Sequence, residues 1–219
     1  MTARRVQGHL VVSAGPTREY VDPVRFLSNV SSGRMGFEIA AAAARSGWRV
    51  TLVAGPVALA TPPGVERVDV VSAREMLTAL RRAFAGADAL VMAAAVADWR
   101  PVRRLAGKWR AKDGGRSATE LALVRNPDIL ATLARRKGRR TVVGFALETG
   151  AGLRRARAKL ERKNADYIVL NDDSALNQGS ATVTILAKDG TVERHERRAK
   201  REIARRIVRL LASHVDSRA

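Results

Sequence analysis

The sequence predicts an α/β fold: a Rossmann-like three-layer sandwich with a mainly parallel sheet, plus a C-terminal β-hairpin. Short apolar runs alternate with segments of helical periodicity along most of the 219 residues, which is typical of a parallel sheet covered by helices. Each helical segment is long enough for a right-handed crossover between neighbouring strands. The length suits one large domain, so we expect residues 1–219 to form a single domain.

The first part of the chain supplies the parallel strands and their crossover helices. The apolar runs predict strands at 9–14, 49–55, 65–71, 89–96, 141–147 and 166–172. Helical patterns begin near Gly33, Ala73, Pro127 and Gly152. Each helix follows one of these runs, so β and α segments alternate as a wound parallel sheet requires.

The pattern changes after residue 172. The stretch ATVTILAKDGTVERHE, residues 181–196, alternates in polarity and carries Asp189-Gly190 at its centre, the strongest short signal for a β-hairpin. A basic helix is expected from about Arg197 to Ser213. The polar, glycine-rich stretch 100–120 is unsuited to a core element, and long loops of this kind are usually functional or disordered.

Charge is the strongest compositional signal. The chain has 40 Lys and Arg residues against 21 Asp and Glu residues, a formal net charge of +19, which makes nucleic acid an obvious candidate partner. Much of the excess, however, lies in stretches such as 197–211, where arginines alternate with Ile, Val and Leu as on a solvated helix face. Few aromatic residues accompany these arginines, which argues against a surface that stacks single strands. A basic nucleic-acid-binding protein is therefore the weaker alternative.

Composition also restricts the chemistry and the compartment. The chain contains no cysteine and three scattered histidines, which excludes thiolate nucleophiles and Cys-based zinc sites and argues against a His-rich metal site. Any metal is expected to have oxygen ligands, as Mg²⁺ usually does. No apolar run approaches the length of a membrane span, and the N-terminal apolar segment is too short for a secretory signal. We expect a cytoplasmic protein without membrane contact.

A candidate anion site lies where the alanine-rich helix begins. Ser31, Ser32 and Gly33 precede that helix, and unpaired backbone N–H groups together with the helix dipole make such a start a seat for phosphate. Plain helix capping is the alternative. The segment between strand and helix lacks the G-x-G-x-x-G spacing and is too long for a dinucleotide loop. A Rossmann-like nucleotide-dependent oxidoreductase stays open, although the second strand is followed by no acid for an adenine ribose.

Five motifs resemble one enzyme family. They are AGPTREYVDPVRFLSN with SSGRMG (14–36), AAAVADWRP (93–101), NPDIL (126–130), GFALET (144–149) and K-x-x-x-KN-x-D-x-I-x-x-ND (159–172). Together they resemble phosphopantothenoylcysteine synthetase, the CTP-dependent ligase of coenzyme A biosynthesis. The resemblance runs from about Leu10 to the final helix. In most bacteria this synthetase follows a flavin-dependent decarboxylase half that these residues do not include, so a stand-alone enzyme and an excised domain both remain open.

The resemblance implies a reaction, co-substrates and partners. The carboxylate of 4'-phosphopantothenate would attack the α-phosphate of CTP, releasing pyrophosphate and leaving an acyl-cytidylate. The amine of L-cysteine would then attack the acyl carbon and release CMP. The family also implies Mg²⁺, a homodimer and, as a candidate partner, a separate flavin-dependent phosphopantothenoylcysteine decarboxylase.

The resemblance assigns the catalytic residues. Arg25 and Asn29 would act around the acyl-cytidylate, where the amide of Asn29 suits an acyl carbonyl. Lys108 would act as a catalytic cation on the nucleotide. It matches the first lysine of a family cluster in which Arg110 and Ala111 replace two later lysines here, which leaves the contribution of Lys112 open. We expect residues 102–116 to form a lid over bound nucleotide.

The resemblance also assigns the nucleotide site. CTP would be bound by Met92, Ala93, Ala94, Asp98, Lys108, Val124, Arg125, Asn126, Pro127, Phe145, Lys159 and Lys163. Asp98 would in addition be a candidate ligand of the nucleotide's Mg²⁺. Lys159 and Lys163 are four residues apart and so share a helix face, where two like charges cost a few tenths of a kcal/mol unless an anion lies between them. For Pro127, ordinary helix initiation is an equal alternative.

Overall fold

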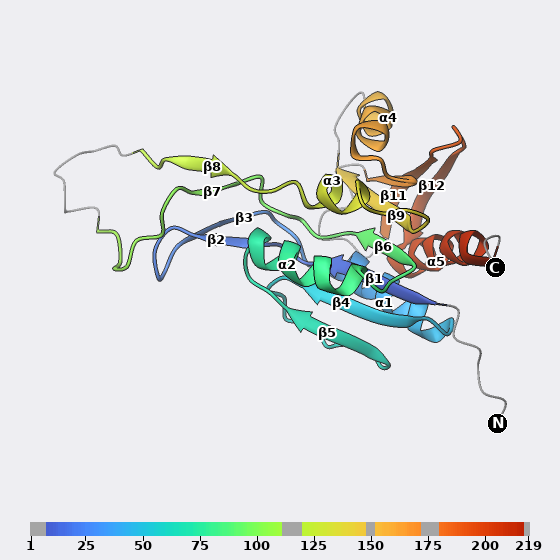
Figure 1. Cartoon of the computed structure of the whole chain (residues 1–219), viewed down its shortest axis with the longest axis horizontal. Coiled ribbons are helices and arrows are strands. Elements are labelled where there is room, and N and C mark those ends of the chain that lie inside the picture. Colours follow the sequence, from blue (N-terminus) through green and yellow to red (C-terminus); the bar gives the residue numbers. More distant parts are fainter. Residues whose placement is uncertain (1–7, 111–119, 148–151, 172–179, 217–219) are drawn as a thin grey trace.

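The computed structural model describes residues 8–110, 120–147, 152–171 and 180–216. Its centre is an eight-stranded sheet of order β12-β11-β10-β9-β6-β1-β4-β5 (Figure 1). The strands are β1 (His9–Ala14), β4 (Arg49–Ala54), β5 (Val65–Asp69), β6 (Ala89–Met92), β9 (Thr141–Leu147), β10 (Tyr167–Asn171), β11 (Ser180–Ala187) and β12 (Val192–Ala199). The six strands from β10 to β5 run parallel, whereas β11 and β12 are antiparallel. The predicted fold class and the C-terminal hairpin are confirmed.

Within the described residues, five helices cover the two faces of this sheet. They are α1 (Arg34–Arg45), α2 (Ala73–Phe84), α3 (Ile129–Ala134), α4 (Gly152–Lys163) and α5 (Lys200–Asp216). The period of two along the strands sorts the core: Val143 packs with residues of α1 and α5, whereas its neighbour Val142 packs with residues of α2 and α3. Because both faces are covered, the central strands are continuous apolar runs.

Small residues let α1 approach β1 closely. A Cβ at Gly36 would lie 2.5 Å from the Cβ of Ala14, so this position of the helix accepts no side chain. The alanines that follow keep the rest of α1 close to the sheet, and Ile39, Ala40 and Ala43 are fully buried. The alanine-rich pattern therefore fixes where the first turn of α1 lies relative to the end of β1.

Several predicted boundaries were wrong by a few residues. The run expected as a strand over 89–96 leaves the sheet after Met92, because the backbone from Ala93 follows the loop after β1, with Ala95 N–H donating to the Gly15 carbonyl (2.9 Å). The helix expected near Pro127 begins at Ile129, because Asp128 caps it by accepting from Ala131 N–H (3.0 Å). The last helix begins at Lys200 instead of Arg197, because β12 continues pairing to Ala199.

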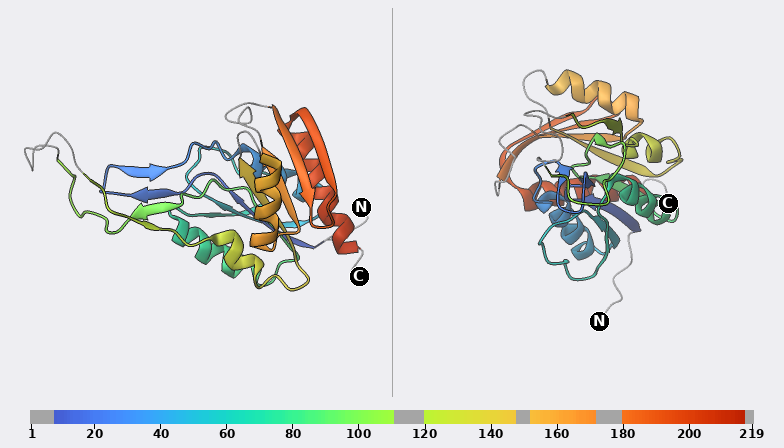
Figure 2. Two further views of the ribbon diagram at one scale, coloured as in Figure 1. Left: turned by 90° about the horizontal axis from the view of Figure 1, so that it is seen from above. Right: turned by 90° about the vertical axis from the view of Figure 1, so that its left-hand side faces the viewer.

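Four short strands missed by the sequence prediction form a projection from the sheet. They are β2 (Arg18–Tyr20), β3 (Phe26–Ser28), β7 (Trp99–Pro101) and β8 (Leu123–Arg125), which make two antiparallel pairs, β2-β3 and β7-β8. We call the arm these four strands together with the described residues that connect β2 to β3 and β7 to β8. Figures 1 and 2 show the arm extending away from the layered body. The described residues of the stretch 100–120, which was expected as a loop, lie here; residues 111–119 are outside the described part.

A buried carboxylate organises the turn between β2 and β3. The Asp22 side chain is fully buried; its Oδ1 accepts from the backbone N–H of Val24 and Arg25 (2.7 Å each). Its Oδ2 accepts from the Arg25 guanidinium (2.8 Å) and from Trp109 N–H (3.0 Å). Burial opposes ionisation, but the backbone hydrogen bonds and the Arg25 charge lower the pKa of Asp22 from 3.8 to about 2. The Asp22 carboxylate thus joins the two halves of the arm.

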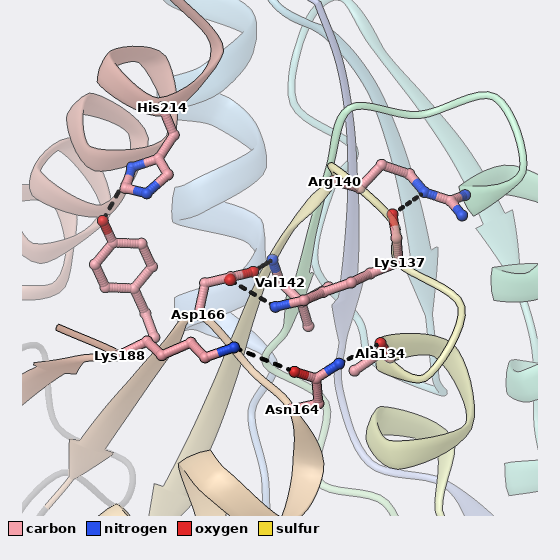
Figure 3. A network of polar contacts seen from close by, with 9 residues as sticks. Ala134, Lys137, Arg140, Val142, Asn164, Asp166, Lys188 and His214 are labelled. Atoms are coloured by element: carbon pink, nitrogen blue, oxygen red, sulfur yellow. Dashed lines mark hydrogen bonds and ion pairs between the residues drawn. The ribbon is translucent and has the colours of Figure 1, made fainter. Parts of the chain in front are cut away.

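A second polar network lies at the start of β9 and β10, at the opposite end of the strands from their carboxyl termini (Figure 3). Lys137 Nζ pairs with Asp166 Oδ1 at 2.5 Å, and Asp166 Oδ2 accepts from Val142 N–H at 2.8 Å. The Lys137 and Asp166 side chains are 9% and 18% exposed. This network connects the segment after α3 to both strands and fixes their relative placement.

Candidate functional site

Two adjoining cavities lie at the carboxyl ends of the parallel strands, where α/β sheets bind ligands. The first, of about 700 Å³, lies between the end of β6, the start of α3 and α4, and we call it the α3–α4 cavity. The second, of about 580 Å³, lies at the start of α1, and we call it the α1 cavity. They share a wall made of Ala94, Val96, Asp98, Phe145 and Lys159, so one extended ligand can occupy both.

Most of the predicted site residues gather in these cavities. The α3–α4 cavity is lined by Met92, Ala94, Asp98, Arg125, Asn126, Pro127, Phe145, Lys159 and Lys163. The α1 cavity is lined by Asn29, Ser31, Ser32, Gly33, Ala93, Ala94, Asp98, Phe145 and Lys159. These residues come from segments far apart along the chain, and the fold brings them together.

Two lysines of α4 face the cavities, as their spacing predicted. Lys159 Nζ donates to the Phe145 carbonyl (2.8 Å), and Lys163 pairs with the Asp128 carboxylate. Burial lowers the pKa of Lys163, and the nearby charge of Asp98 partly opposes that shift. Both cations are therefore held at the cavity wall by oxygen acceptors, beside a space that can take an anionic ligand.

Asn126 holds the base of the arm against the segment that follows β6. Its backbone N–H donates to the Asp98 carbonyl and its side-chain amide to the Ala97 carbonyl (2.8 Å each). Arg100 donates to Asn126 Oδ1 at 3.3 Å. The side chain of Asn126 is thus engaged in structure, and it sets the position of Asp98 and Pro127 at the cavity.

The start of α1 has the features of an anion seat. Gly33 occupies the N-cap position at φ +74° and supplies no side-chain cap, and a Cβ there would lie 3.2 Å from the backbone nitrogen of Gly15. The first turn contains no acidic residue. Asn29 lies beside this seat and donates from Nδ2 to the Val96 carbonyl (3.0 Å).

Three predicted residues lie away from the two cavities. Arg25 is in the turn between β2 and β3, where it pairs with Asp22 and donates to the Trp109 carbonyl (2.5 Å). Lys108 is exposed in the neighbouring segment of the arm, and Val124 is exposed on β8. None of the three lines either cavity. Lys112 lies outside the described residues.

The structure adds site residues that the sequence reasoning did not select. Asp128 and Arg162 line the α3–α4 cavity, and Arg34, Asn171 and Lys200 line the α1 cavity. Asp128 lies within the NPDIL motif and Asn171 at the end of an apolar strand, so both carried a signal. Lys200 carried none, because it was expected within a generic basic helix.

The site holds few groups for a permanent metal. Over the described ranges, no cluster of three or more His, Cys, Asp or Glu side chains is arranged to hold a metal ion. Asp98 presents one exposed carboxylate to both cavities. Within the same described ranges, none of the helices combines the length and the apolar character that crossing a membrane requires.

Comparisons with known proteins identify the family to which this chain belongs. A family model described as the DNA/pantothenate metabolism flavoprotein C-terminal domain matches residues 6–215. The chain is 44% identical over 186 residues to the coenzyme A biosynthesis bifunctional protein CoaBC of Vibrio parahaemolyticus, covering 83% of this chain and 46% of that protein. It is 48% identical over 172 residues to CoaBC of Escherichia coli, covering 78% and 42%. It spans about half the length of these relatives.

A solved structure gives the same result in three dimensions. The crystal structure of the C-terminal domain of a CoaBC protein superposes with a TM-score of 0.84 at 38% identity, covering 98% of this chain and 100% of that one. The similarity therefore includes the arm as well as the layered body. The local structure also argues against a dinucleotide-binding oxidoreductase, because the segment between β1 and α1 contains β2 and β3 instead of a tight glycine-rich turn.

Proposed function

Because the chain belongs to the family of phosphopantothenoylcysteine synthetase domains found in CoaBC proteins, we propose that it joins 4'-phosphopantothenate to L-cysteine with CTP. The observation that carries this proposal is the joined pair of cavities at the carboxyl end of the sheet, lined by cations, by the α1 seat and by Asn29. A ligase of this type must hold a triphosphate and a carboxylate side by side, and the wall that the two cavities share supports this proposal.

In the first half-reaction, the substrate carboxylate attacks the α-phosphate of CTP and pyrophosphate leaves. Negative charge develops on phosphate oxygens, so fixed cations lower the barrier. Lys159 and Lys163 already lie at the cavity wall and can exchange their present acceptors for phosphate oxygens. Phe145, on the shared wall, offers a ring face for cytosine or ribose.

In the second half-reaction, the cysteine amine attacks the acyl carbon of the acyl-cytidylate, and CMP leaves. Charge now develops on the acyl oxygen, which calls for a preoriented donor close to it. Asn29 is held beside the α1 seat by its hydrogen bond to the Val96 carbonyl. We assign to this amide the positioning of the acyl group.

Magnesium fits the same site through the nucleotide. A single carboxylate together with phosphate oxygens is how Mg²⁺ is commonly bound, and Asp98 supplies that carboxylate at the wall shared by both cavities. When bound, the ion would neutralise phosphate charge. Asp98 would then set where the phosphates lie relative to Lys159.

We further propose that the protein acts as a homodimer joined through the arm. The arm exposes large apolar side chains, among them Val24 (59%), Trp99 (43%), Val102 (62%) and Leu123 (41%), and such a concentration of apolar and aromatic groups is typical of an interface. Arg25 and Lys108 lie on the same arm, outside the cavities of their own chain. In the homodimer, Arg25 and Lys108 would act at the cavities of the second copy. The product would pass to a flavin-dependent decarboxylase.

One assay tests the proposed reaction. Purified protein is incubated with 4'-phosphopantothenate, L-cysteine, Mg²⁺ and each nucleoside triphosphate in turn, and CMP or its equivalent is quantified. We expect phosphopantothenoylcysteine and one nucleoside monophosphate per turnover, with CTP. If none of the triphosphates supports turnover, the ligase function is refuted. Equal turnover with ATP and CTP would refute the CTP preference while leaving the ligase function intact.

A further inference from the structure

A third cavity lies between α2 and the outer strands of the sheet. Its volume is about 830 Å³, and it is lined by residues of α2 and of the strands β1, β4 and β5. We call it the α2 groove. It shares no lining residue with the α3–α4 cavity or the α1 cavity, so the proposed reaction does not account for it.

The groove has an apolar floor because α2 does not cover the edge of the sheet. α2 packs against β1 and β4, whereas β5 is the outermost strand (Figure 1). Side chains alternate along a strand, so Thr51 of β4 lies on the same face as Glu66 and Val68 of β5. Opposite them, α2 contributes Ala79 and Ala83, which like Val68 are only partly buried. An apolar floor with a few polar groups around it is typical of a small-molecule site.

One of the two carboxylates in the groove is occupied by a chain of polar contacts. Glu66 Oε2 accepts from the Thr51 hydroxyl (3.3 Å), and Thr51 Oγ1 lies 2.9 Å from His9 Nε2. The other ring nitrogen, His9 Nδ1, lies 2.8 Å from Arg49 Nη2. The chain thus holds Arg49 over the amino end of β4 and engages Glu66 within the protein.

Three exposed arginines line the groove without a carboxylate partner. They are Arg49, Arg74 and Arg82, and in the part of the chain that the structure describes no ion pair includes any of them. Glu75, the second carboxylate of the groove, accepts from a backbone N–H and a hydroxyl of the two residues before α2 (2.9 Å each). Because Glu66 is engaged as well, the arginines are available to an anion from outside the chain.

The position of these cations gives the groove a direction. The chain enters α2 from the carboxyl end of β5 and leaves it for the amino end of β6, so the helix runs antiparallel to the strands. Arg82, in the last turn of α2, and Arg49, the first residue of β4, therefore both lie at the amino edge of the sheet. Guanidinium groups bind carboxylate and phosphate oxygens with two parallel hydrogen bonds. An anionic head group is favoured at this end, with an apolar body along the floor.

We infer that the α2 groove is a second ligand site, which binds a small amphipathic anion. Its carboxylate or phosphate head would lie beside Arg49 and Arg82, and its apolar body would lie against Val68, Ala79 and Ala83. A second copy of this chain is disfavoured as the occupant, because the net charge of +19 opposes contact at an arginine-lined surface. The inference is independent of the proposed ligase reaction.

The test uses three probes with the same eight-carbon chain: octyl phosphate, nonanoate and the neutral octanol. Calorimetric titration measures their binding to the full chain below the concentrations at which they form micelles. Arg82→Gln removes a head-group cation, and Ala79→Phe fills the floor of the groove. Arg81→Gln is the matched control, because Arg81 is exposed on the same helix but does not line the groove. Thermal unfolding shows that each variant is folded.

The parent is expected to bind at least one of the two anions and to bind octanol about tenfold more weakly or less. Arg82→Gln should weaken anion binding by about ten- to a hundredfold, the usual effect of a charged hydrogen bond. Ala79→Phe should also weaken it, whereas Arg81→Gln should bind like the parent. The anion bound more tightly identifies the head group as carboxylate or phosphate. No anion binding by the parent, equal binding of octanol, or an unchanged affinity in either groove variant would overturn the inference.

Discussion

At the scale of single residues, Asn29 and Lys108 are expected to act in different half-reactions. Lys108→Gln removes a cation assigned to the CTP phosphates, so pyrophosphate release should fall even when cysteine is omitted, by about 10² to 10³ for one electrostatic contact. Asn29→Asp keeps the shape but places a negative charge at the acyl carbonyl, so cysteine transfer should suffer more than activation.

Single-turnover measurements of pyrophosphate and CMP, with and without cysteine, separate these two effects. Lys108→Gln with pyrophosphate release at the parent rate would show that the lysine is not needed for activation. Asn29→Asp that slows both steps equally would remove the assignment of the amide to the acyl group. Because Lys108 is exposed on the arm, its replacement should leave the melting temperature unchanged.

Asp22 predicts how the arm responds to acid. Its folded pKa of about 2 is below the ordinary 3.8, so its contribution to stability is complete above pH 4 and is lost as pH falls from about 4 towards 2. Amide exchange at Val24, Arg25 and Trp109, whose N–H groups donate to this carboxylate, should accelerate over that interval. In Asp22→Asn, exchange should be fast already at neutral pH. Identical pH profiles in parent and variant would contradict this role.

At the scale of elements, the ion pair between Lys137 and Asp166 couples the segment after α3 to β9 and β10. Lys137→Met leaves a mostly buried carboxylate without its cation, so the free energy of unfolding should fall by about 3 kcal/mol, measured by urea denaturation. Adding Asp166→Asn to this variant removes the unpaired charge while keeping an acceptor for Val142 N–H, and should recover part of the loss. A change below about 0.5 kcal/mol in the single variant would show that the pair contributes little.

The segment 102–116 is the predicted lid. Its described part is already attached to the arm, with Leu105 N–H donating to the Val21 carbonyl (2.8 Å) and Trp109 N–H to Asp22, whereas residues 111–116 lie outside the described part. Ordering over bound nucleotide should appear as slower amide exchange between Lys108 and Arg116 when CTP is added. Equal exchange with and without CTP would exclude a lid function.

At the scale of the whole molecule, the arm is expected to hold two copies together. Leu123→Glu places a charge within the exposed apolar surface of the arm and should convert dimer to monomer at micromolar concentration, measured by sedimentation equilibrium. Val192→Glu is the matched control, because Val192 is similarly exposed, at 44%, but lies on β12 in the body. A parent protein that is monomeric, or a Leu123→Glu dimer as stable as the parent dimer, would contradict the arm interface.

The sequence by itself determined the parallel sheet, its crossover helices and about half of the residues that line the two cavities. These features depend on local signals: a short apolar run makes a strand, and the residues that follow parallel strands meet at one edge of the sheet. Asp98 follows an apolar strand and was singled out in this way, whereas Phe145 and Lys163 were assigned through the family resemblance; all three line the α3–α4 cavity.

Only the tertiary structure decided where the arm lies and which distant residues complete the site. The strands of the arm are three residues long, too short to show a periodicity, and Asp22 joins segments separated by more than eighty residues. Lys200 joins the α1 cavity because α5 packs on α1, a contact between surfaces that no local pattern encodes. Contacts of this kind depend on the packing of the whole molecule. For the same reason, only the tertiary structure shows that Arg25 and Lys108 line neither cavity of their own chain.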